Sequence, residues 1–98
     1  MKYGPAVKKW AFDELGKPRG IRALIASLPS ILWEGSEWQE ISVAKMVSNA
    51  QVKRAYFSAI RVVAPDKNQE QAYHIQYLSN RIYNYLNDAW KLHTNPPS

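Results

Sequence analysis

Cysteine is absent from this chain of 98 residues, so no disulfide framework can hold the fold and no thiolate can serve as nucleophile or metal ligand. Histidine is scarce. His74 and His93 lie far apart in the chain with no acidic cluster between them, which argues against a metal site. We find no nucleophile–base pairing and no phosphate-binding loop. We therefore expect neither an enzyme nor a cofactor.

Long apolar runs are also missing, and none approaches the roughly 18 residues of a membrane span. The first ten residues lack the apolar stretch of a secretory signal. These absences favour a cytosolic or nuclear location without membrane insertion, and of the two we expect the cytoplasm. They are equally compatible with a fragment whose targeting sequence lies elsewhere.

Acidic residues do not occur between Glu40 and Asp66. Over the whole chain, 13 basic and 8 acidic residues leave a net charge of +5. Such a surface suits an acidic partner, and composition leaves three classes open: nucleic acid, anionic lipid or an acidic protein face.

The first third of the chain predicts two helical segments and a loop. Pro5 fits the first turn of a helix through residues 6–15, with Gly16 beyond its end. Residues 21–28 carry apolar side chains at helical spacing, and Pro29 should kink or end this helix. Residues 33–42 are typical of a loop, whose Trp33 and Trp38 we expect to pack under it as satellite core rather than form a ligand platform.

The middle of the chain predicts a short helix over residues 42–47 and then a long amphipathic one. Ser48 followed by Gln51 is a capping-box signature. The helix it opens should end near Ala64, because the residue before Pro65 is disfavoured in helical conformation. One face of this helix is apolar: Val52, Ala55, Tyr56, Ala59, Ile60 and Val63. Three cations lie off that face: Lys53, Arg54 and Arg61.

A second long helix is predicted over residues 69–93, which contain neither Gly nor Pro. Its apolar face comprises Ile75, Leu78, Ile82, Leu86, Ala89 and Trp90. Long helices joined by a short loop usually pack antiparallel. We find no internal repeat and no β-type alternation, so we expect an all-α domain.

Several segments of this pattern resemble a known family. KRAYFSAIRVVAPDKN (53–68) resembles helix II and the following turn in J-domains of DnaJ-type co-chaperones, and LNDAW (86–90) is similar to their helix III signature. VKKW (7–10) and GIRALIASLPSILWEGSEW (20–38) are similar to the corresponding segments of auxilin-type J-domains. The resemblance extends over residues 7–92, as four blocks in order.

The resemblance implies a fold: a J-domain with a long antiparallel helix II and helix III hairpin and extra N-terminal helices, as in auxilin. On this basis we expect an N-terminal helix and linker at residues 1–19, an auxilin-like J-domain at 20–93 and a tail at 94–98. A monomer is expected, because no apolar stripe is left over.

The resemblance also implies a partner. J-domains of this family bind the ATP state of the heat shock protein 70 chaperone and accelerate its ATP hydrolysis, and auxilins use this to disassemble clathrin coats. Clathrin would be engaged through this segment or through upstream ones. The chaperone-binding residues carried over are Lys53, Arg54, Arg61, Ala64, Pro65, Asp66 and Lys67.

Two departures from the family bear on activity. The family's His-Pro-Asp motif reads Ala64-Pro65-Asp66, and a methyl group can neither donate nor accept a hydrogen bond. We therefore expect weak stimulation of the chaperone, whether Ala64 is engineered or natural. Phe57 and Ser58 replace an Arg-Lys pair. Phe57 is either a lone exposed residue or packs on the N-terminal helices, and we expect the latter.

Three other interpretations remain. Asp66 could simply cap the return helix. The domain could be a J-like interaction module that has lost chaperone stimulation. A nucleic-acid-binding helical domain is a weaker fit, because base readout needs a cluster of Arg, Asn or Gln, and this helix carries only three dispersed cations. We expect no nucleic-acid partner.

Overall fold

The structure, a computed structural model, describes residues 3–96. In that range it contains the α-helices α1 (Tyr3–Ala11), α2 (Ile21–Ala26), α3 (Asn49–Val63) and α4 (Tyr73–Thr94). Short 3₁₀ turns lie between them: η1 (Leu28–Ser30), η2 (Val43–Lys45) and η3 (Pro65–Asn68). Met1 and Lys2 of the expected N-terminal segment, and residues 97–98 of the expected tail, lie outside the described residues.

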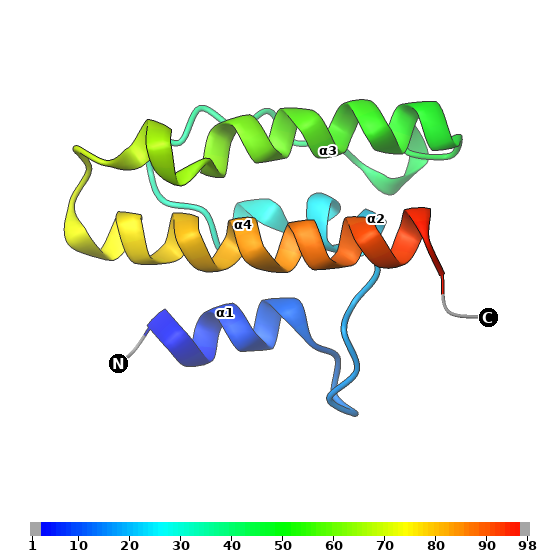
Figure 1. The fold of residues 1–98 in the computed structure, drawn as a ribbon, viewed down its shortest axis with the longest axis horizontal. Coiled ribbons are helices and arrows are strands. Elements are labelled where there is room, and N and C mark those ends of the chain that lie inside the picture. The colour runs from blue at the N-terminus through cyan, green and yellow to red at the C-terminus, as the bar shows by residue number, and fades with distance from the viewer. Residues whose placement is uncertain (1–2, 97–98) are drawn as a thin grey trace.

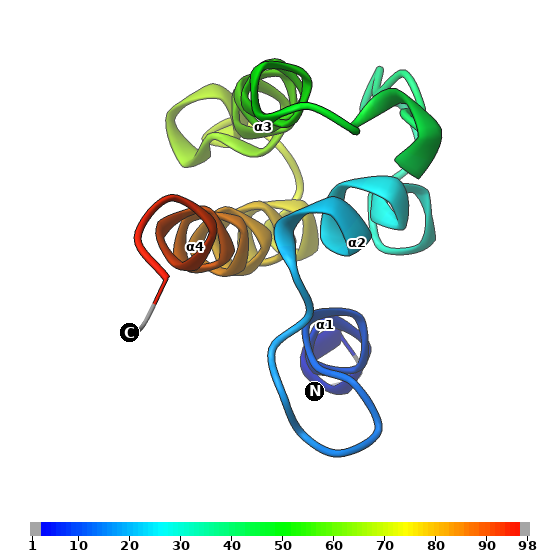
Figure 2. The ribbon, with the colours of Figure 1, turned by 90° about the vertical axis from the view of Figure 1, so that its right-hand side faces the viewer.

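Helices α3 and α4 run antiparallel and are joined by η3 (Figure 1). Helix α2 lies beside α4 beneath α3, and α1 lies further from α3 (Figure 2). Helix α4 contacts α1, α2 and α3, so it is the central element of the domain. No strand occurs among residues 3–96, and the expected all-α architecture with its long antiparallel helix pair is confirmed.

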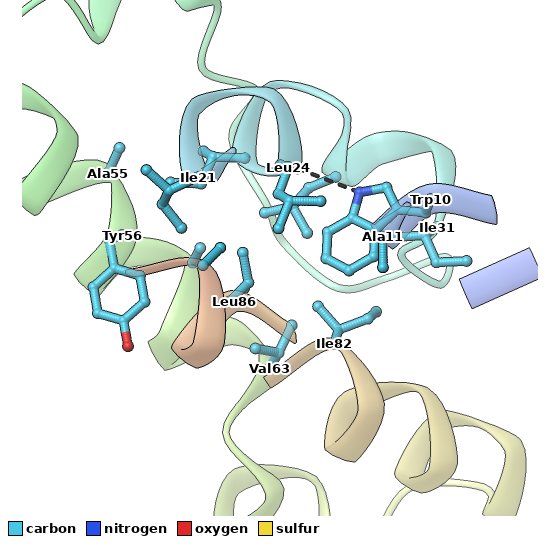
Figure 3. Close-up of a cluster of buried hydrophobic side chains, with 14 of the residues drawn as sticks. Trp10, Ala11, Ile21, Leu24, Ile31, Ala55, Tyr56, Val63, Ile82 and Leu86 are labelled. Carbon is cyan, nitrogen blue, oxygen red and sulfur yellow. Dashed lines mark hydrogen bonds between the residues drawn. The ribbon is translucent and has the colours of Figure 1, made fainter. Parts of the chain in front are cut away.

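The core forms where the apolar faces of the helices meet (Figure 3). The predicted face of α3 is buried except for Ile60, which is half-buried. The predicted face of α4 is likewise buried, apart from half-buried Ile75 and Trp90. The hydrophobic periodicity therefore predicted which side of each long helix faces the interior.

The start of α3 follows its sequence signature. The Ser48 hydroxyl accepts a hydrogen bond from the Gln51 backbone N–H at 3.2 Å. The Gln51 side-chain oxygen in turn accepts from the Ser48 N–H at 2.9 Å. This reciprocal pair is the predicted capping box, and it satisfies backbone donors that the helix itself leaves free.

Helix α1 ends earlier than predicted, at Ala11 rather than near residue 15. The Asp13 carboxylate accepts hydrogen bonds from the backbone N–H groups of Leu15 and Lys17, both at 2.9 Å. An isolated antiparallel β-bridge between the backbones of Phe12 and Pro18 closes the same turn. The short acidic side chain thus competes successfully with the helix for backbone donors.

Trp10 fixes α1 to the rest of the molecule. Its indole is 6% exposed, and Nε1 donates a hydrogen bond to the Leu24 carbonyl of α2 at 3.3 Å (Figure 3). Burial of a large aromatic ring with its polar atom satisfied is a favourable arrangement. The sequence alone did not predict where Trp10 packs.

The connection between α2 and α3 is less helical than predicted. Of the two effects expected of Pro29, the structure shows an end of the helix and no kink: α2 ends at Ala26, and Pro29 lies in the turn η1 that follows. The short helix expected over residues 42–47 is only the turn η2. Trp33 and Trp38 are half-buried and pack against the core, as expected for satellite core residues.

Candidate functional site

The candidate site is the elbow between α3 and α4, which we define as residues 64–68. Ala64 leaves the helical region with φ −56° and ψ 125°, as expected for the residue before a proline. Pro65 then opens η3, and the Lys67 N–H donates to the Ala64 carbonyl at 3.1 Å. The elbow is therefore a defined turn with little backbone freedom.

The buried side chain of Asn68 fixes the conformation of the elbow by hydrogen bonds to the end of α3. Its side chain is 5% exposed, and Nδ2 donates to the carbonyls of Val62 at 3.1 Å and Ala64 at 2.8 Å. Carbonyls at the end of a helix lack intrahelical donors, and this amide supplies one. The sequence analysis missed this role. The available signal was an amide residue just after a proline turn, a position where Asn often bonds to nearby backbone.

The elbow presents its charged residues to solvent. Asp66 and Lys67 are exposed, and Ala64 and Pro65 are half-buried. Helix α4 has Ala72 as its N-cap residue, without any side-chain cap. The interpretation of Asp66 as a cap for the return helix is therefore wrong. Within residues 3–96, no hydrogen bond from the backbone or from another side chain to the Asp66 carboxylate is found.

The three cations of α3 lie on its exposed side. Arg54 and Arg61 are seven positions apart, which places them about 20° from each other around the helix and opposite the buried face. Lys53 is exposed as well, about 100° from Arg54. The cations thus share one side of α3 but are spread along it, with Lys53 about 15 Å before the end of the helix.

A cleft of about 790 Å³ lies beside the elbow. Arg61 and Lys67 line it from α3 and η3, and the loop carrying Trp33 and Trp38 forms its other wall. The Trp38 Nε1 atom is buried and has no hydrogen-bond partner among the described residues. The structure therefore brings Arg61 and Lys67 together at one surface, whereas Lys53 does not line this cleft.

Phe57 does not pack on the N-terminal helices, so that expectation is wrong. It is 48% exposed, and its ring lies 5.5 Å from that of Tyr56 and 6.5 Å from that of Trp90. The Tyr56 and Trp90 rings stack at 4.6 Å between α3 and α4. Phe57 thus extends an aromatic cluster at the seam of the two long helices.

The site can recognise a partner through its charged side chains and its shape. Among residues 3–96, no group of three or more His, Cys, Asp or Glu side chains could hold a metal ion. No helix in the described range is long and apolar enough to cross the bilayer.

Burial, with a smaller contribution from the nearby Tyr83, raises the pKa of Tyr56, which belongs to the aromatic seam and not to the elbow.

Comparison with known proteins supports the architecture. No protein-family model matches the chain. UBA domain-containing protein 7 of Schizosaccharomyces pombe is 39% identical over 88% of the chain. From Arabidopsis thaliana, Auxilin-related protein 1 is 31% identical, and J domain-containing protein required for chloroplast accumulation response 1 is 30% identical, each over 86% of the chain.

The chain spans only a small part of these relatives, corresponding to 12%, 9% and 13% of their respective lengths. The similarity therefore concerns one domain of longer proteins. Within the chain it covers 86–88% of the residues. The all-helical fold, with its antiparallel α3–α4 pair, and the similarity to auxilin-related and J domain-containing proteins support the assignment of this chain as a J-domain.

Proposed function

We propose that this domain is a co-chaperone module that docks on the ATP state of a heat shock protein 70 chaperone. The observation that carries the proposal is the outward-facing elbow with exposed Asp66 and Lys67, next to a helix whose cations share its exposed side. The similarity to J domain-containing and auxilin-related proteins adds support. The expected contact residues remain Lys53, Arg54, Arg61, Ala64, Pro65, Asp66 and Lys67.

In this proposal the domain performs no chemistry of its own and is not an enzyme. A ligand shifts a conformational equilibrium only by its difference in affinity for the two states. The domain would bind the chaperone state that hydrolyses ATP fastest. Exposed cations on α3 would speed encounter with an acidic face, since such charges act mainly on association rate and specificity.

The Asp66 carboxylate is suited to a guanidinium on the chaperone. It is exposed on a turn that Pro65 and Asn68 hold in place. Bidentate pairs between carboxylate and arginine are strong and demand correct geometry, which a fixed turn provides.

Ala64 limits this function. It lies at the position where the J-domain family has histidine, half-buried at the start of the elbow. Without an imidazole, one hydrogen-bonding group is missing from the docking surface. We propose that the chain as it stands binds the chaperone but stimulates its ATPase weakly.

The client process that fits best is the disassembly of clathrin coats in endocytosis. The support is the similarity to Auxilin-related protein 1 of Arabidopsis thaliana and the four auxilin-like sequence blocks. Clathrin would be bound through this segment or through others of a longer protein. A cytoplasmic, monomeric domain is the form that suits this role.

A second candidate is a J-like interaction module that has lost chaperone stimulation. Ala64, Phe57 and Ser58 favour it, because each replaces a polar or basic residue of the family's docking surface. The two candidates predict different responses to restoring the imidazole.

The test is a single-turnover ATPase assay with a heat shock protein 70 chaperone. We expect the chain to stimulate weakly and Ala64→His to raise the stimulated rate about tenfold, the equivalent of about 1.4 kcal/mol, roughly one hydrogen bond. Ala50→His, at an exposed site in the first turn of α3, is the matched control and should change nothing. Adding Asp66→Asn to Ala64→His should abolish the gain. If Ala64→His neither stimulates nor binds the chaperone, the interaction-module function replaces the proposed one.

A further inference from the structure

Phe57 lies at the centre of the exposed face of α3, with the cations of that helix around it. A turn of about 100° per residue places Lys53 about 40° from it on one side, and Arg61 and Arg54 about 40° and 60° from it on the other. Each cation is three or four positions from Phe57 in the chain, the spacing at which side chains on a helix are neighbours. The ring is therefore bordered by cations on both sides.

The ring of Phe57 is supported from behind. Its centroid lies 5.5 Å from that of Tyr56 and 6.5 Å from that of Trp90, and the Tyr56 and Trp90 rings are themselves stacked at 4.6 Å. An aromatic side chain that is already packed on one side has little rotational freedom left to lose when a partner covers the other. Phe57 is thus a positioned apolar group, although it is 48% exposed.

Exposure alone would carry no argument, because single exposed apolar residues are ordinary. Leu92 of α4 has the same exposed fraction of 48%, but Asp88 lies one turn before it. What distinguishes Phe57 is the border of cations and its place in the family pattern. J-domains have a basic residue at this position, so the fold itself does not require an apolar one.

The charge around Phe57 is of one sign along the chain, since no acidic residue occurs between Glu40 and Asp66. Glu37 and Glu40 line the cleft that Arg61 also lines. Phe57 does not line that cleft, which meets α3 through Ser58, Arg61 and Val62 on the side of Arg61 away from the ring. The partner of this face must therefore supply carboxylates on both sides of an apolar centre.

We infer that Phe57 is the central anchor with which α3 enters an apolar groove on the heat shock protein 70 chaperone, and that acidic residues on the two rims of this groove meet Lys53, Arg54 and Arg61. Protein interfaces commonly have an aromatic anchor at the centre and charged residues at the rim. An amphipathic helix with anchors at intervals of three and four residues is a recurring way to fill a groove. Single-stranded nucleic acid is bound instead in a positively charged groove, whereas α3 presents a convex face.

This inference rests on the proposed docking to the chaperone and adds to it which kind of chaperone surface is selected. The family uses an Arg-Lys pair where this chain has Phe57 and Ser58. On this inference the replacement changes the kind of contact rather than removing it. A chaperone that offers carboxylates without an apolar groove would bind this chain less tightly.

The test is the affinity of the 98-residue chain for a heat shock protein 70 chaperone with ATP, measured by fluorescence anisotropy at a series of salt concentrations. The unmodified chain and Ala64→His provide two backgrounds. We expect Phe57→Ala to weaken binding about tenfold at every salt concentration, because it removes an apolar contact. Phe57→Leu should keep most of the affinity, whereas Phe57→Arg should bind about fivefold more weakly although it supplies the charge typical of the family.

Matched controls separate apolar contact, charge and folding. Leu92→Ala removes an equally exposed side chain and should leave binding unchanged. Lys53→Gln should reduce the dependence of affinity on salt, and Lys9→Gln, at an exposed site on α1, should not. Phe57→Ala and Leu92→Ala should unfold at similar urea concentrations, so that a loss of binding in the first is not a loss of fold.

Three results would overturn the inference while leaving the proposed function in place. Phe57→Ala could bind the chaperone as tightly as the unmodified chain, or Phe57→Arg could bind at least as tightly, which would assign the face to charge alone. Single-stranded RNA could bind the chain in a way that depends on Phe57, which would assign the ring to base stacking. If neither the unmodified chain nor Ala64→His binds the chaperone, the proposed function itself fails and this inference fails with it.

Discussion

Asn68 illustrates how a single buried amide shapes the candidate site. It is the residue on which the conformation of the elbow depends, because its Nδ2 donates to two carbonyls at the end of α3. We predict that Asn68→Ala lowers the free energy of unfolding by about 1–3 kcal/mol, because it leaves these carbonyls without that donor. Urea denaturation followed by circular dichroism would measure the change.

The neighbouring Gln69→Ala is the control, since Gln69 is exposed and should change stability by less than about 0.5 kcal/mol. Asn68→Ala should also lose part of the ATPase gain conferred by Ala64→His. Equal stabilities of the two variants would contradict the assigned role of the amide.

Tyr56 makes stability depend on pH at the alkaline end. Burial, reinforced by Tyr83, raises its pKa above the ordinary value of 10.0. Since the folded pKa exceeds the unfolded one, the contribution of the neutral phenol is complete below pH 10 and is lost as the pH rises through the folded pKa. We predict that Tyr56→Phe shows a smaller loss of stability above pH 10 than the unmodified chain, measured by denaturation at a series of pH values.

Tyr73→Phe serves for comparison, because Tyr73 is 79% exposed and should leave the alkaline profile unaltered. Identical profiles for Tyr56→Phe and the unmodified chain would argue against this residue as the cause.

At the scale of elements, the start of α3 depends on its capping box. We predict that Ser48→Ala costs about 1 kcal/mol of stability, because the Gln51 N–H loses its acceptor. Ser42→Ala provides a matched comparison, since Ser42 precedes η2 without making a side-chain cap. The difference in urea midpoint between the two variants tests the prediction. A loss at Ser42 as large as at Ser48 would contradict it.

The elements that sequence could predict are those with local signals. Ser48 and Gln51 specify the start of α3, and Pro65 specifies its end, because both effects act between residues close in the chain. Local competition also explains the error at α1. Asp13 offers its carboxylate to the turn, and that interaction outweighs the helical preference of the residues after Ala11.

Features that depend on distant residues were not predictable in the same way. The hydrogen bond from Trp10 to Leu24 joins α1 to α2, and no residue spacing in the sequence predicts it. Phe57 was misplaced for the same reason, since its position beside Trp90 follows from the register of α3 against α4. In the candidate site, exposed Asp66 and Lys67 followed from the turn, whereas the bonds of Asn68 and the cleft beside Arg61 required the three-dimensional arrangement.

At the scale of the whole molecule, stability depends most on the centre of α4. Ile82 is fully buried where α4 meets the other helices (Figure 3). We predict that Ile82→Val costs about 0.5–1.5 kcal/mol and Ile82→Ala about 2–5 kcal/mol, because each leaves unfilled volume in a close-packed core. Urea denaturation would measure both changes.

Leu92→Ala, on the same helix but 48% exposed, should cost much less than Ile82→Ala. If the two alanine variants were equally stable, α4 would not be the centre of the core.

The order of the helices in the chain has a consequence for synthesis. Helix α4 contacts α1, α2 and α3, yet it follows all of them in sequence. A polypeptide leaving the ribosome therefore exposes the apolar sides of three helices before their common partner emerges. During that interval the nascent domain itself has the features of a chaperone client.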